Sequence, residues 1–161
     1  MKRFLHTFAL LALLAALGAL AGCNGNTRRV SPPAAAIQQL TVQADGSWTV
    51  DLRLHNYSSV PMRFEQVRLE VSVDEHVAGT LQATPGLSIG PTSADVVKAT
   101  LRPQPMARMA AADALAGRRS LSYRLEGTVS ATPEEASKPR EFEIDDRSSL
   151  NPAPGLDGVL R

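Results

Sequence analysis

The feature that most constrains the fold is a strict alternation of apolar and polar residues between positions 48 and 55. The even positions are all apolar: Trp48, Val50, Leu52 and Leu54. The odd positions are Thr, Asp, Arg and His. Because successive side chains of a β-strand point to opposite faces, this segment would bury one face and expose the other. The pattern is typical of an antiparallel strand that covers a hydrophobic core.

Further segments of the same kind follow, separated by turn signals. Asp45-Gly46 predicts a two-residue type I′ turn that joins this strand to a preceding one over residues 40–44. In residues 61–73 the apolar positions change parity near Glu65-Gln66. A one-residue slip would turn every later side chain to the wrong face, so we predict a β-bulge there.

One stretch, residues 106–117, has a helical pattern that begins after Pro105 and ends at Gly117. We expect Met106, Met109 and Ala110 to pack this helix onto the sheets. Alternation returns after the helix, over residues 121–129 and 142–145. The sequence therefore predicts a mainly β fold, a fibronectin III-like or Ig-like β-sandwich of about seven strands with one short crossover helix at about 106–117.

The N-terminus has the organisation of an export signal. Met1-Lys2-Arg3 is basic, and residues 8–21 are apolar and without charge. This run is shorter than the about 20 residues that span a bilayer as a helix. A basic start, a short apolar run and small residues at its end together predict a secretory signal peptide over residues 1–22.

The residues at the end of this signal are Leu20-Ala21-Gly22-Cys23, which resemble the lipobox of bacterial lipoproteins. The resemblance implies cleavage between Gly22 and Cys23, a diacylglycerol on the thiol and an acyl chain on the new amine. No other cofactor is expected. Cys23 is the only cysteine of the chain, so it has no partner for an intramolecular disulfide in an oxidising compartment.

Asn24, where an aspartate would retain a lipoprotein at the inner membrane, implies the outer membrane and a domain that faces the periplasm. The segment over residues 23–36 is polar and then Pro- and Ala-rich, which predicts a lipidated flexible tether. We expect the sandwich over residues 37–148 and a flexible tail over residues 149–161. The signal holds two of the 17 Lys and Arg residues and none of the 16 Asp and Glu residues, so the mature net charge is about −1. This balance gives no indication of a nucleic-acid partner.

A second resemblance covers residues 38–146, nearly the whole domain. The run WTVDLRLHN is followed by an Asn56-Tyr57-Ser58 turn and then by the Pro61-Met62-Arg63-Phe64 step. Together with residues 123–129, it resembles the type-2 late embryogenesis abundant family, also called the WHy (water stress and hypersensitive response) domain. The family often has proline directly after the asparagine, whereas here the proline is delayed to Pro61. The resemblance implies a fibronectin-like sandwich and an association with desiccation and stress tolerance.

The chain offers little that points to catalysis. The mature histidines, His55 and His76, lack the spacing of metal-binding motifs, and Gly-x-Ser-x-Gly does not occur. We therefore predict no metal site, no catalytic residue and no enzymatic activity. Tyr57 and Asn56 are the candidate contact residues, because an aromatic side chain in a turn is open to a partner.

Three functions remain open at this point. The first is a lipid-anchored envelope protein that protects client proteins or membranes under desiccation or osmotic stress. The second is a periplasmic protein that binds or transfers a lipid or another hydrophobic ligand, which predicts an apolar groove between the sheets or beneath the helix. The third is a subunit of an envelope assembly, which predicts an exposed apolar patch. The client, the ligand and the oligomeric state are left open.

Overall fold

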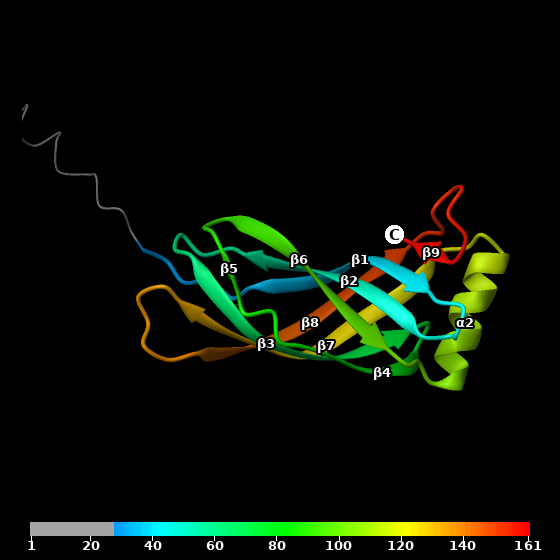
Figure 1. Ribbon diagram of the computed structural model, residues 1–161, viewed down its shortest axis with the longest axis horizontal. Helices are drawn as coiled ribbons and strands as arrows, with labels where there is room; N and C mark the ends of the chain where they lie inside the picture. The colour runs from blue at the N-terminus through cyan, green and yellow to red at the C-terminus, as the bar shows by residue number, and fades with distance from the viewer. Residues whose placement is uncertain (1–27) are drawn as a thin grey trace, which may run out of the picture.

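The computed structural model describes residues 28–161, so the predicted signal peptide, the predicted cleavage site at Gly22 and Cys23 and the first part of the predicted tether lie outside the described residues. The described chain forms two antiparallel sheets packed face to face, with one helix at one end (Figure 1). In chain order, its elements are β1 (Ala34–Val42), β2 (Trp48–Asn56), β3 (Met62–Val73), β4 (His76–Ala83), β5 (Leu87–Ile89), β6 (Ser93–Leu101), α2 (Pro105–Ala116), β7 (Leu121–Pro133), β8 (Arg140–Leu150) and β9 (Val159–Leu160).

The strand order separates the two layers. One sheet has the order β6-β2-β1-β9, and the other has the order β4-β3-β7-β8 with β5 paired to β3. Helix α2 follows β6 and precedes β7, so it carries the chain from the first sheet to the second. The predicted mainly β sandwich with one short helix is confirmed. The strand count differs because β5 and β9 have three and two residues, too few to produce a periodic pattern.

The alternation in β2 has the predicted outcome. Its even-numbered side chains from Trp48 to Leu54 are fully buried between the sheets, within one core cluster that includes Phe64, Leu69 and Leu125 of the other sheet. Burial of this apolar face is the main force that holds the sheets together. The Trp48 indole nitrogen Nε1 has no hydrogen-bond partner among the described residues.

The irregularities of the strands correct one prediction and confirm another. The register of β3 against β7 shifts between Phe64 and Gln66, where the β-bulge was predicted.

The prediction of a type I′ turn at Asp45-Gly46 is wrong. Of these two residues Gly46 alone has a positive φ, and its N–H donates to the Gln43 carbonyl. The Asp45 carboxylate accepts hydrogen bonds from the N–H and the hydroxyl of Ser47 within the connection between β1 and β2, which is longer than two residues. These bonds lower the pKa of Asp45. The two-residue turn with positive φ at both positions is instead Asp74-Glu75, between β3 and β4.

Both ends of the domain extend beyond the predicted limits. Strand β1 begins at Ala34, inside the predicted tether, and Ala35 is buried. Strand β8 runs on to Leu150, and β9 pairs with β1 through Leu40 opposite Leu160, which is fully buried. The predicted flexible tail over residues 149–161 is therefore corrected, because its last residues close the edge of a sheet.

Helix α2 docks through a different face from the one predicted. Its buried residues are Ala107, Ala111 and Ala114, whereas Met106 and Met109 are 54% and 59% exposed. Residues at i, i+4 and i+7 share one face of a helix. Alanine on that face lets the helix backbone come close to the sandwich, and the longer methionines are left on the outside.

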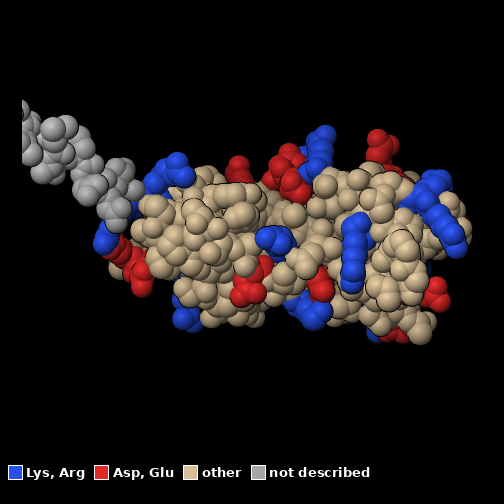
Figure 2. All heavy atoms as spheres, turned by 90° about the horizontal axis from the view of Figure 1, so that it is seen from above, with Lys and Arg blue, Asp and Glu red and all other residues tan. Residues whose placement is uncertain are grey.

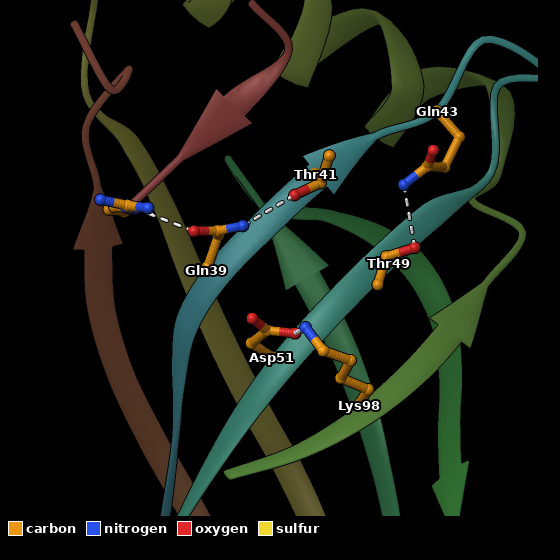
Figure 3. Close-up of polar contacts among 7 residues, drawn as sticks. Gln39, Thr41, Gln43, Thr49, Asp51 and Lys98 are labelled. Atoms are coloured by element: carbon orange, nitrogen blue, oxygen red, sulfur yellow. Dashed lines mark hydrogen bonds and ion pairs between the residues drawn. The ribbon is translucent and has the colours of Figure 1, made fainter. Parts of the chain in front are cut away.

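The outer faces of both sheets are polar. On the four-stranded sheet, Gln39 donates to Thr41, Gln43 donates to Thr49, and Lys98 pairs with Asp51 at 2.7 Å (Figure 3). On the other sheet, Arg124 of β7 makes two bonds of 2.8 and 2.9 Å to the carboxylate of Asp145 on β8, and this guanidinium lowers the pKa of Asp145. Positive and negative side chains are interspersed over the molecule, as Figure 2 shows for one face.

Candidate functional site

The candidate contact residues lie where β2 ends and the loop over residues 57–61 leads into β3. The Asn56 side-chain oxygen Oδ1 accepts a bond of 2.9 Å from the backbone N–H of Ser58. An asparagine that bonds the backbone two residues further on makes an Asx turn. This local bond turns the chain away from the direction of β2 and exposes the residue in between, Tyr57.

Asn56 itself is fully buried. Its Nδ2 lies 2.9 to 3.0 Å from three backbone carbonyl oxygens, those of Val60, Ile89 and Gly90. One amide group thus joins the β2–β3 loop to the β5–β6 connection. The prediction that Asn56 contacts a partner is corrected: its polar atoms are directed into the protein, where they hold two loops together.

The same loop binds the N-terminal segment that leads from Cys23. The backbone of Arg29 donates to Ser59 Oγ at 2.7 Å, and the Ser59 N–H donates to the Arg29 carbonyl at 2.9 Å. The N–H of Ser31 donates to Ser58 Oγ at 3.0 Å. Ser58 is fully buried, so this bond is shielded from solvent on one side. The segment over residues 28–31 is therefore held on the sandwich and does not act as a free tether.

Two further connections meet at this loop. Thr92, between β5 and β6, donates its N–H to the Ser58 carbonyl, and Glu134, after β7, donates its N–H to the Pro61 carbonyl. Arg28 forms an ion pair with Glu135. We call this part of the molecule the loop end; it comprises residues 28–31, 56–61, 89–92 and 134–135. Helix α2 lies at the opposite end of the sandwich (Figure 1).

Tyr57 is the exposed aromatic residue of the loop end. Its side chain is 46% exposed, and its ring stacks on the ring of His55 with a centroid distance of 4.0 Å and an interplanar angle of 25°. The stack gives the phenol ring a defined position at the surface. The role of Tyr57 as a contact residue stays a prediction.

The surface of the described chain has hollows at the C-terminal end of α2 and over the second sheet. One, of about 540 Å³, is formed by Leu115, Arg118 and residues 151–158. The other, of about 500 Å³, is lined by Asp74, Ser122, Arg147 and their neighbours on β3, β7 and β8. Residues 28–161 contain no group of three or more His, Cys, Asp or Glu that could hold a metal. Nor does this part of the chain include a helix with the length and apolarity of a membrane span.

The sequence carried a signal for part of this site. Asn-x-Ser after a strand favours an Asx turn, which would have given Asn56 an internal role and left Tyr57 exposed. Ser58, Ser59 and Arg29 were missed because their bonds link segments about thirty residues apart. No local pattern reports such a pairing.

Comparison with known proteins gives distant similarities. No protein-family model matches the sequence, and no curated protein matches it. Among solved structures, the chain is similar to a protein from Archaeoglobus fulgidus (12% identity, 78% of this chain and 98% of that chain, TM-score 0.42). It is also similar to a protein from Arabidopsis thaliana (10% identity, 81% and 84%, TM-score 0.48) and to a putative late embryogenesis abundant protein (12% identity, 95% and 90%, TM-score 0.49). At these identities and TM-scores, the similarities do not identify a function.

Proposed function

We propose that this chain is a lipid-anchored protein of the bacterial envelope whose β-sandwich acts by contact and not by catalysis. The anchor is the lipid on Cys23, and the outer membrane, on its periplasmic side, is the proposed location. The proposed role is protection of client proteins or membranes during desiccation or osmotic stress. The resemblance of residues 38–146 to the WHy domain supports this role.

The observation that carries the proposal is the attachment of residues 28–31 to the loop end. Ser59 and Ser58 hold Arg29 and Ser31 on the sandwich, six and eight residues after Cys23. A domain joined to its anchor in this way would stay next to the membrane that carries it. Two or more acyl chains would make such an anchor stable, since a single chain gives only marginal binding.

A drying experiment tests the protective role. Cells that lack the protein, cells with the wild-type chain and cells with Cys23→Ser are dried and rehydrated, and survival is counted. We expect the deletion and Cys23→Ser to lower survival to a similar extent, because both remove the domain from the membrane. Equal survival of all three strains would contradict the proposed role.

The carrier function gains no support from the structure. Between the sheets, the described chain places fully buried side chains such as Leu52, Phe64 and Leu125, and Ala107 and Ala111 fill the space beneath α2. The hollow of about 540 Å³ opens at the C-terminal end of α2, where Leu115 and Arg118 line it together with residues 151–158, and the other hollow lies over β3, β7 and β8. The assembly function predicted a continuous apolar patch. Of the exposed large apolar residues of the described chain, two belong to the loop end (Val30 and Tyr57), two lie on α2 (Met106 and Met109), and the others lie in separate segments (Val77, Val96 and Leu156).

A further inference from the structure

We propose that the loop end is a membrane-seating surface: its exposed side chains Tyr57 and Val30 rest in the interfacial layer of the bilayer that carries the Cys23 lipid. The proposal rests on the lipid anchor proposed above and adds an orientation and a contact to it. It takes as its ligand the headgroup layer of a phospholipid membrane.

The length of the chain between the anchor and the sandwich restricts the distance between them. Five residue steps separate Cys23 from Arg28. Fully extended, they span at most about 18 Å, since a chain covers no more than about 3.6 Å per residue. The hydrogen bonds of Arg29 to Ser59 then fix the segment two residues from Tyr57. The loop end must therefore lie close to the lipid surface, whatever path residues 24–27 take.

The topology places the rest of the molecule away from that surface. Tyr57 precedes β3, whereas α2 contacts the sandwich near the other end of β3, where Gln104 donates its N–H to the Ala78 carbonyl. The twelve residues of β3 are separated by eleven steps, which extend over about 36 Å at about 3.3 Å per step. Helix α2, which carries the exposed Met106 and Met109, thus lies at the distal end of the sandwich. Figure 1 shows this position of the helix.

The chemistry of the loop end fits an interfacial position. Tyrosine combines an apolar ring with a polar hydroxyl, and such side chains are enriched at the level of lipid headgroups. The stack on His55 holds the Tyr57 ring outward at 46% exposure, and Val30 is 38% exposed. The charges of the loop end are balanced, because it contains two positive residues, Arg28 and Arg29, and two negative residues, Glu134 and Glu135. Arg28 and Glu135 form an ion pair. We therefore expect the seating to be independent of anionic lipid.

Fluorescence quenching by brominated lipid tests the proposal. Trp48 is the single native tryptophan and is fully buried, so an added tryptophan can be followed against a protected background. The full mature protein is purified from membranes as wild type, Tyr57→Trp, Val30→Trp and Met109→Trp. Acylation of Cys23 is verified by intact mass, and each protein is reconstituted into phosphatidylcholine vesicles with bromines near the top of the acyl chains.

We expect about a twofold loss of the added emission for Tyr57→Trp and Val30→Trp and no loss for Met109→Trp, because bromine quenches an indole only at short range, within the interfacial layer. Acylated protein with no quenching at either loop-end probe, or with equal quenching at Met109→Trp, would overturn the seating and leave the anchor intact. A mass without acyl chains would overturn both. Quenching that appears only after phosphatidylglycerol is added would also overturn the proposal, since charge and not the aromatic ring would then drive the contact.

Discussion

The side-chain amide of Asn56 makes its hydrogen bonds inside the protein. Its side chain bonds one backbone N–H and lies within hydrogen-bond distance of three carbonyl oxygens. A buried amide or carbonyl that loses its partner keeps the full cost of its desolvation. The connection between the β2–β3 loop and the β5–β6 connection therefore depends strongly on this side chain.

We expect Asn56→Ala to lower the free energy of unfolding by about 3 kcal/mol, since several buried backbone groups would lose their partner. Urea titration followed by the fluorescence of the buried Trp48 measures the change. Asn151→Ala is the matched control, because Asn151 is exposed, and we expect a change within about 0.5 kcal/mol. Equal effects of the two substitutions would show that the Asn56 network contributes nothing.

Tyr123 joins the two sheets through its hydroxyl. The N–H of Ile37, next to the bulge of β1, donates to this oxygen at 3.2 Å. Burial raises the pKa of Tyr123 above its ordinary value of 10.0. The pKa of Tyr123 is thus higher in the folded than in the unfolded state. The stability that the protonated, buried hydroxyl contributes is therefore fully present below pH 10 and is lost as the pH rises through the folded pKa.

The Tyr123→Phe variant separates these two effects. At neutral pH we expect it to be about 1–2 kcal/mol less stable than wild type, because the Ile37 N–H loses its acceptor. Between neutral pH and about pH 11, the wild type should lose stability faster, so that the gap narrows. Urea titrations at several pH values measure it. A gap that stays constant or widens at alkaline pH would show that burial of the Tyr123 hydroxyl does not raise its pKa.

At the scale of the element, α2 shows how a local pattern can mislead. The methionines at 106 and 109 are large apolar side chains near the start of its sequence, yet the buried face belongs to Ala107, Ala111 and Ala114. The choice of face depends on the distance between the helix and β4, which no residue of the helix encodes. We expect Ala111→Leu to destabilise the fold by about 1–3 kcal/mol through overpacking, and Met109→Ala to change it by less than about 0.5 kcal/mol. Thermal unfolding of both variants measures the two changes in stability. If Met109→Ala were the more destabilising substitution, the methionine face would be the docking face.

Strand β7 shows the opposite case, in which a local signal had a structural meaning. Gly127 interrupts the alternation, and its φ of 152° is one that residues with a side chain rarely adopt. A Cβ there would lie 2.3 Å from the carbonyl oxygen of Arg68 on β3. We expect Gly127→Ala to cost more than about 3 kcal/mol, beyond the usual range of a single substitution. Gly90→Ala, where the nearest atom to the new Cβ would be 3.8 Å away, serves as the control and should fold normally in the same denaturation assay.

For the whole molecule, the alternating segments were sufficient to predict the two-sheet sandwich, because one apolar face per strand leaves few other ways to bury it. The bulge in β3 followed from the same reasoning, since the parity of its apolar residues changes. The closing strand β9 and the attachment of Arg29 to Ser59 could not be predicted in this way. Both depend on pairings between distant segments. A contact of only two residues gives no periodic pattern in the sequence.

These distant contacts are also what connects the fold to the proposed role. The bonds between Arg29 and Ser59 make the first described residues part of the sandwich, and five residue steps of the chain join Arg28 to Cys23. The proposed role thus depends on the chemical state of a single residue. If Cys23 carries lipid, the loop end is close to a membrane; if it does not, the attachment of residues 28–31 has no bearing on location.

The mass of the mature N-terminus, measured on protein extracted from its own membranes, tests the lipid anchor most directly. We expect a chain that begins at Cys23 and carries a diacylglycerol on the thiol and an acyl chain on the amine. A chain that begins at another residue, or one in which Cys23 is an unmodified thiol, would contradict the anchor and the membrane role that depends on it.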